Sequence, residues 1–227
     1  RLDGAGWNSQ SGQTNAVSPG GSPGTAASAQ PATVLLIPAN TAIVPGRLTA
    51  VRLDNEGKFR LPPTGKGAYL LSVSGLPRGA YVKSARYGAQ DATHEPLKVG
   101  DEQNALEIDV SSKGAAVSGI LLKDNGEPEA KTLVTVWPKT PDLGSRSRGV
   151  KSAFTDSKGG FGMEGIAPGD YYVAAWEALD SGLRESDFLG RFTGRATAVS
   201  LVESQKAVVT LKVIPKDAVA AEVARLP

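Results

Sequence analysis

The 227-residue chain contains no cysteine, one histidine and one methionine, and only 6% of its residues are aromatic. Without cysteine, both a disulfide framework and a cysteine nucleophile are excluded. This absence does not decide the cellular compartment, because disulfides are mainly a device of small secreted domains. No run of about 18 apolar residues exists, so the sequence predicts no helix that spans a membrane.

An excess of charge of one sign is also missing. The chain has 25 Lys and Arg against 23 Asp and Glu, a net charge of +2. A nucleic-acid-binding protein would need a clustered basic face, so nucleic acid is not predicted as a partner. The chain begins with Arg1 and shows no signal peptide. We therefore expect a mature or partial chain, processed or trimmed at its N-terminus.

Glycine (27) and proline (15) are abundant, which favours turns and short strands over long helices. Apolar and polar residues alternate with the strand period of two in many short segments. The predicted strands lie within "TVLLIP", "GRLTAVRLD", "KFRLPP", "GAYLLSVS", "AYVKSARYG", "LEIDVSS", "AAVSGILL", "LVTVWP", "VKSAFTD", "GGFGMEG", "GDYYVAAW" and "TAVSLVESQKAVVTLKVIP". Only "SGLRESDFLGRF" and "KDAVAAEVARLP" favour helix or irregular structure. The pattern predicts an all-β chain built as β-sandwiches.

One turn-and-strand pattern occurs twice. Asp54, Gly57, Phe59, Gly67 and Tyr69 match Asp156, Gly159, Phe161, Gly169 and Tyr171 at a constant offset of 102 (156 − 54). The strand that ends at Pro38 recurs 100 residues later, at Pro138. A constant offset indicates an internal duplication. The predicted units are an extended N-terminal segment (1–32), two sandwiches (33–113 and 114–215) and a C-terminal tail (216–227).

The repeated residues have reasons that concern folding. The aspartate can accept hydrogen bonds from amides of its own turn, and the glycine supplies a positive φ. Pro168-Gly169 predicts a type II turn, which Lys66-Gly67 replaces in the first copy. The tyrosine starts a strand with its ring inward and its hydroxyl free for a backbone partner. We therefore expect these residues to be scaffold, with all four repeated aromatic rings buried.

Residues 115–215 contain, in order, Val117-Ser118-Gly119, a turn before Pro128, the strand ending in Pro138, and the Asp-x-x-Gly-x-Phe and Pro-Gly-x-Tyr motifs. In this combination they closely resemble the carboxypeptidase regulatory-like domain, a seven-stranded sandwich related to transthyretin. The resemblance implies two tandem antiparallel seven-stranded Ig-like sandwiches, as in large bacterial surface or secreted proteins. It implies an exported structural, adhesive or carbohydrate-contacting module without catalytic residues. Glu127 departs from the family's usual turn residue.

The first unit matches this pattern less fully, because its opening strand is missing. At the corresponding place, no apolar run follows Val17-Ser18-Pro19-Gly20. An uncovered sheet edge is normally blocked or paired. Residues 1–32 are too poor in apolar groups to order themselves by burial. We hypothesise that this segment joins copies of the chain by strand addition, with Trp7, Val17 and Val34 at the subunit interface. It could instead fold back on its own domain, or continue from an upstream domain.

The candidate chemical sites are weak. His94 beside Asp91 forms neither a zinc site nor a triad, because further ligands and a nucleophile elbow are missing. Two turn clusters could bind calcium, but hairpin turns explain them better: Asp54, Asn55 and Glu56, and Asp124, Asn125 and Glu127. Trp137 and Trp176 fall within strands, which favours burial over sugar stacking. The basic loop with Arg146, Arg148 and Lys151 is typical of a solvated loop. No metal, cofactor or catalytic residue is predicted.

The predicted function is that of a non-catalytic extracellular or cell-surface protein, a subunit of a self-assembling structure or filament. Its partners would be copies of itself or neighbouring domains of the same surface protein. The alternative is a carbohydrate-binding accessory module of a larger secreted or outer-membrane protein, which would need an exposed row of aromatic residues. An enzyme would require a further part of a longer chain.

Overall fold

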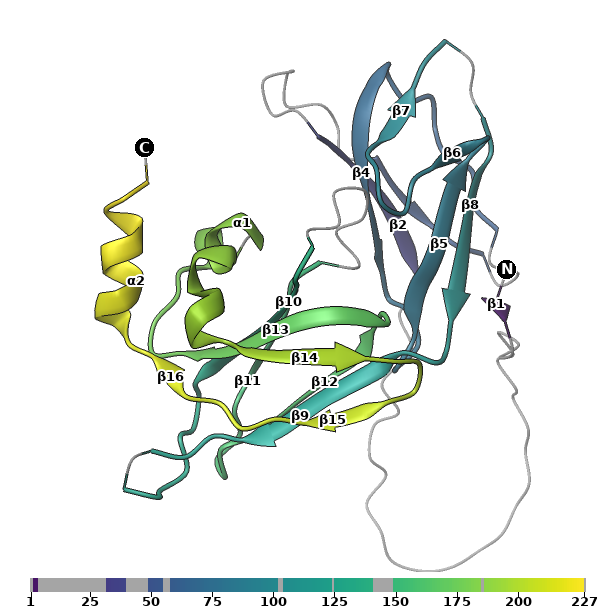
Figure 1. The fold of residues 1–227 in the computed structure, drawn as a ribbon. Helices are drawn as coiled ribbons and strands as arrows, with labels where there is room; N and C mark the ends of the chain where they lie inside the picture. Colours follow the sequence, from purple (N-terminus) through teal and green to yellow (C-terminus); the bar gives the residue numbers. More distant parts are fainter. Residues whose placement is uncertain are drawn as a thin grey trace, which may run out of the picture.

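The computed structural model describes residues 2–3, 32–39, 49–54, 58–101, 104–123, 125–140, 149–184 and 186–226. They form a mostly β structure with two lobes (Figure 1). Strands β1 to β8 form the first lobe, and the elements from β9 to the C-terminal helix form the second. Among the described residues, no helix has the length and apolar character needed to cross a membrane.

The first lobe is a sandwich of two sheets. One sheet has the order β3-β2-β4-β7 and the other β1-β8-β5-β6. The strands are β1 (Leu2–Asp3), β2 (Thr33–Pro38), β3 (Thr49–Arg52), β4 (Gly67–Ser74), β5 (Tyr81–Tyr87), β6 (Gln90–Asp91), β7 (Leu97–Val99) and β8 (Leu106–Ser111). Alternate residues of β2 point inward, so Val34 and Leu36 are buried in the core between the sheets.

The second lobe repeats the two-layer plan. One sheet has the order β11-β10-β13-β14, with β16 added to β13, and the other has the order β12-β9-β15. The strands are β9 (Ala115–Ile120), β10 (Leu133–Pro138), β11 (Lys151–Phe154), β12 (Gly160–Ile166), β13 (Gly169–Trp176), β14 (Thr197–Leu201), β15 (Lys206–Val208) and β16 (Val213–Ile214). Phe161, Met163 and Tyr171 lie in the core between these sheets.

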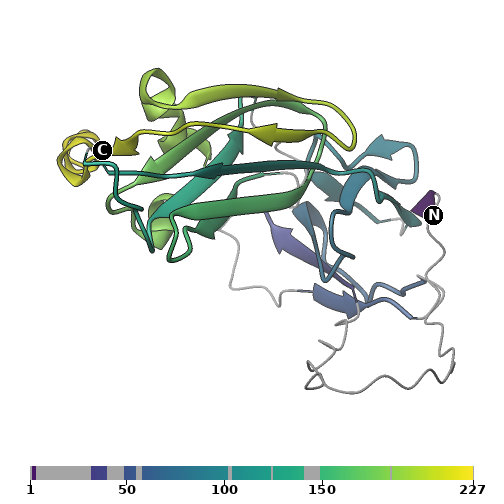
Figure 2. The same cartoon turned by 90° about the horizontal axis from the view of Figure 1, so that it is seen from below.

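Short helices cover the outer face of the larger sheet in the second lobe (Figures 1 and 2). They are η2 (Ser181–Leu183), α1 (Ser186–Leu189), η3 (Gly190–Arg195) and α2 (Lys216–Val223). Under them lies a second apolar cluster, in which Trp176 meets Phe192 edge-on at 5.1 Å between ring centroids. Because both faces of this sheet are covered, Leu133 to Trp137 of β10 are all buried. The larger sheet is therefore an internal layer at its central strands β10 and β13.

The β3-β2-β4-β7 sheet of the first lobe and the larger sheet of the second lobe share one pairing register. Thr33 pairs with Ser74 and with Arg52 in the first lobe, as Leu133 pairs with Trp176 and with Phe154 in the second. The edge strands also agree, since the pair Gly67–Val99 corresponds to Gly169–Leu201. The lobes differ in the segment that precedes the edge strand. The first lobe has the β5–β6 hairpin between β4 and β7, and the second has the helices η2, α1 and η3 between β13 and β14.

Most predicted strands are present, and both segments that favoured helix contain helices. The prediction of a strand in "KFRLPP" is wrong, since residues 58–63 form no strand. Pro62 and Pro63 have no backbone N–H to donate to a neighbouring strand. The strands β1, β6 and β7 were not predicted, because strands of two or three residues are too short to show an alternating pattern.

Candidate functional site

The repeated aspartate turns are built in the same way in both lobes. Asp156 Oδ1 accepts hydrogen bonds from the backbone N–H groups of Lys158 and Gly160, both at 2.8 Å. Asp54 Oδ1 accepts one from the N–H of Lys58 at 2.8 Å. These carboxylates bond to the amides of their own turns, so they hold the turns in place. Gly57 lies outside the described residues.

Gly159 has two reasons to be glycine. Its φ is +74°. A Cβ at this position would lie 2.3 Å from the carbonyl oxygen of Leu121, which also accepts the N–H of Glu129. Both observations give the residue a structural role.

The tyrosines of the repeat anchor their own turns. The Tyr171 hydroxyl donates to the carbonyl oxygen of Ala167 at 2.8 Å, and the Tyr69 hydroxyl donates to that of Gly65 at 2.8 Å. The acceptors are 102 residues apart (167 − 65), as are the donors. Each hydroxyl therefore fixes the loop that leads into its strand.

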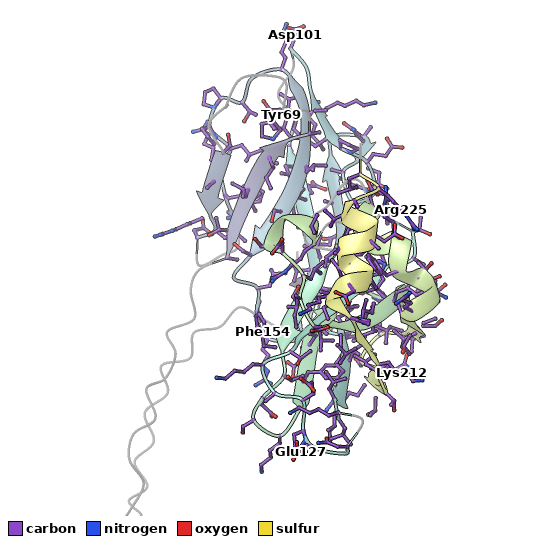
Figure 3. The ribbon with its side chains drawn as sticks, turned by 90° about the vertical axis from the view of Figure 1, so that its left-hand side faces the viewer. Tyr69, Asp101, Glu127, Phe154, Lys212 and Arg225 are labelled. Carbon is purple, nitrogen blue, oxygen red and sulfur yellow. The ribbon has the colours of Figure 1, made fainter. Side chains whose placement is uncertain are left out.

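Burial differs between the two copies. Phe161 and Tyr171 are buried, but Phe59 and Tyr69 are only half-buried against the first core, which corrects the prediction that all four rings are buried. The position of Phe59 explains its exposure, because it lies in an irregular segment rather than in a strand like Phe161. Figure 3 shows Tyr69 in the first lobe, at the end away from the second.

The backbones of the two lobes meet closely at two glycines. The N–H of Gly114 donates to the carbonyl oxygen of Gly79 at 3.0 Å. A Cβ on Gly114 would lie 2.4 Å from that oxygen, and a Cβ on Gly165 would lie 2.5 Å from the carbonyl oxygen of Ala80. Gly165 also has a φ of +66°. Only glycine allows this approach without moving the lobes apart.

Side chains also bridge the lobes. Arg78 binds the carboxylate of Glu164 through Nε at 2.8 Å and Nη2 at 3.0 Å. The hydrogen bond from Arg78 holds the pKa of Glu164 below its usual value. The Tyr81 hydroxyl donates to Glu203 Oε1 at 3.0 Å. The joint thus combines close backbone packing with polar contacts.

A groove of about 310 Å³ lies at this joint. One wall is the continuous segment 73–81 of the first lobe, and the second lobe contributes Lys151, Glu164 and Gly165. Burial lowers the pKa of the Lys151 ammonium. The basic sequence around Lys151 favours a solvated loop. Lys151 instead begins β11 and lines the groove, a position that depends on packing between lobes.

His94 is exposed and close to Asp91. Burial alone would raise the pKa of Asp91, but hydrogen bonds from Thr93 and the nearby His94 outweigh it and lower that pKa. Both residues line a second groove together with Lys83 and Arg86. No group of three or more metal-ligating side chains occurs in the part of the chain that the structure describes.

The other candidate sites have structural explanations. Asn125 Oδ1 accepts the N–H of Glu127 at 3.1 Å within the turn that joins Leu122 to Pro128. Trp137 and Trp176 are buried, and Trp176 Nε1 donates to Thr135 Oγ1 at 2.8 Å. Neither ring is available for stacking on a sugar. Asn55, Glu56, Asp124, Arg146 and Arg148 lie outside the described residues.

The proposed subunit-interface residues receive different outcomes. Trp7 and Val17 lie outside the described residues. Val34 is fully buried in the first core, which contradicts its assignment to a subunit interface. Its place on the inward face of β2 gives the reason, because β2 lies between β3 and β4 and turns Val34 toward the opposite sheet.

The N-terminal strand β1 holds one edge of the first lobe. Leu2 pairs with Val110 and Asp3 with Ser111, parallel to β8. On its other side, β8 pairs antiparallel with β5. In the second lobe, β15 pairs in parallel with β9, which opens that sandwich. As the parallel neighbour of β8, β1 thus corresponds to β9, the parallel neighbour of β15, although 29 residues separate β1 from β2 (32 − 3).

Comparison with known proteins gives no family. No family model matches the chain, and no curated protein matches it. Among solved structures, a "putative carbohydrate binding protein" from Pseudomonas aeruginosa is 20% identical, with 45% of this chain and 89% of that chain covered and a TM-score of 0.29. A streptococcal ancillary pilin is 13% identical, with 74% and 50% covered and a TM-score of 0.32.

A minor pilin of Streptococcus agalactiae is 12% identical, with 82% of this chain and 81% of that chain covered and a TM-score of 0.28. This chain spans half of the ancillary pilin and most of the minor pilin. The overall superpositions are too poor to transfer a fold or a function.

Proposed function

We propose that this chain is a non-catalytic structural subunit that assembles with its own copies by exchanging its N-terminal segment. The observation that carries the proposal is the pairing of β1 with the edge of β8. A two-residue strand makes few backbone hydrogen bonds, each worth about 0.5–1.5 kcal/mol net. Releasing β1 therefore costs little, and it exposes an edge that an identical strand can pair.

The length of the connection permits this exchange. Residues 4–32 join β1 to β2. A segment of this length reaches about 90 Å when fully extended, at about 3.3 Å per residue. The β1 strand of one copy can thus reach β8 of a neighbour. Such a contact joins two different surfaces of the chain. Copies therefore add head to tail, and they form a filament unless their rotation closes them into a ring.

The register shared by the β3-β2-β4-β7 sheet and the larger sheet of the second lobe supports a further part of the proposal: the lobes are duplicated sandwiches of the carboxypeptidase regulatory-like type. We also infer export to the cell surface and the absence of enzymatic activity. The residues repeated between the lobes support turns and cores, as the bonds of Asp156 and Tyr171 illustrate. The carbohydrate-binding alternative gains no support from Trp137 and Trp176, which the core buries.

The test is to delete residues 1–31, which retains the buried Ala32, and to compare masses in solution by light scattering. We expect the intact chain to form assemblies that grow with concentration and the shortened chain to be monomeric. Circular dichroism should show that both sandwiches stay folded. A peptide of residues 1–12 should shrink the assemblies, whereas a scrambled peptide should not. Equal mass distributions for both chains would refute the proposal.

A further inference from the structure

The groove at the joint holds a positive charge that its neighbours leave uncompensated. Arg78 donates from Nε and Nη2 to the Glu164 carboxylate, and Lys206 also lies close enough to Glu164 to lower its pKa. Lys151 has no salt bridge to any described residue. The groove is lined by two basic residues, Lys151 and Arg78, and one acidic residue, Glu164, so its walls carry one net positive charge.

The position of Lys151 in β11 is unusual for a lysine. Residues 151 and 153 lie on the same face of the strand, and Ala153 packs against the second core. The lysine stem thus starts from the core-facing side, and the residue lines the groove. Burial is the cause that lowers its pKa, so the folded chain disfavours the charged form. A partly buried ammonium loses some of its contacts with water, and a bound anion would take the place of those contacts.

We propose that the groove between the lobes binds a small, singly charged organic carboxylate, with Lys151 as its counter-ion. The volume of about 310 Å³ lies at the lower end of the range for small-molecule sites, roughly 300–1,000 Å³, and suits a ligand of monosaccharide size. Because segment 73–81 and Lys151 come from different lobes, the ligand would contact both and tighten the joint.

The first experiment uses isothermal titration calorimetry on the full chain with glucuronate as the probe. Glucose is the neutral control of the same ring size, and acetate tests the carboxylate alone. We expect glucuronate to bind, glucose to give no heat, and acetate to bind more weakly than glucuronate. If glucuronate does not bind, or if glucose binds as tightly, the proposal is wrong.

Two variants test the role of the charge in opposite directions. Lys151→Met keeps the stem and removes the ammonium, and its glucuronate affinity should fall about tenfold or more, the effect of losing a charge-assisted hydrogen bond. Glu164→Gln removes the groove's carboxylate and should strengthen binding. Thermal unfolding checks that both variants fold. Unchanged affinity in Lys151→Met would overturn the assignment.

Lys151 has a competing explanation as an inward charge that protects the edge strand β11 from pairing with other chains. That role predicts that Lys151→Met forms larger assemblies than the wild-type chain at the same concentration, and that the wild-type chain gives no heat with glucuronate. Light scattering and the titration together separate the two roles. The glucuronate titration also stands apart from the proposed assembly, because it does not involve residues 1–31.

Discussion

Replacing Gly165 by alanine should loosen the joint between the lobes. Gly165 has a φ of +66°, a conformation that costs an alanine about 1–2 kcal/mol. Its new Cβ would lie 2.5 Å from the carbonyl oxygen of Ala80, a backbone atom that cannot rotate away. The lobes must separate, which weakens the bond between Tyr81 and Glu203, worth about 1 kcal/mol. We expect the free energy of unfolding to fall by about 2–3 kcal/mol.

Gly162→Ala is the matched control for this change. Gly162 lies on the same strand, β12, is exposed, and has no atom within 4 Å of the position of a Cβ. Its substitution should change stability by less than about 0.5 kcal/mol, as at an ordinary surface site. Urea unfolding followed by tryptophan fluorescence measures both variants, and small-angle scattering reports the separation of the lobes. If the two variants have equal stability, the joint is not built on Gly165.

Four further substitutions test the scaffold. Phe161→Ala should destabilise the second lobe by about 3–5 kcal/mol in urea unfolding, because its ring is buried in the core; a cost under 1 kcal/mol would contradict this. Tyr171→Phe should cost about 1 kcal/mol and Tyr69→Phe less, since the first hydroxyl bond is buried and the second exposed; the reverse order would count against it. Because Arg78 holds the pKa of Glu164 low, wild type should exceed Glu164→Gln in stability at neutral pH, and the difference should disappear as pH falls through that lowered pKa. A difference that persists in strong acid would refute this assignment.

The elements that could be predicted from the sequence are those determined by residues close together in the chain. The strands ending at Pro38 and Pro138 have alternating or continuous apolar residues, and the aspartate turns carry their own hydrogen-bonding groups. Strand β1 was not predicted, because two residues are too few to show the apolar–polar alternation of a strand. The joint was not predicted either, since the reason for Gly114 and Gly165 is the backbone of the other lobe.

Lys151 illustrates the same limit for the candidate site. In sequence it follows a basic loop, so it resembles a solvated residue. Its burial depends on β11 lying beside the segment 73–81 of the first lobe. The covering of Trp137 and Trp176 by helices is likewise a long-range effect. The sequence predicted that these rings are buried, but not that they lie on the outer face of the sheet.

The most direct test of strand exchange uses the absence of cysteine in the chain. Leu2 and Val110 are partners in the β1–β8 pairing, so one chain can carry Leu2→Cys and another, of different mass through a tag, Val110→Cys. Mixing and oxidising the two chains should give a disulfide between chains of different mass. A chain with only one of the substitutions, mixed with the unchanged protein, is the control. If a chain with both substitutions closes its own disulfide and the mixture yields no cross-linked pair, β1 stays on its own lobe and the account of assembly is wrong.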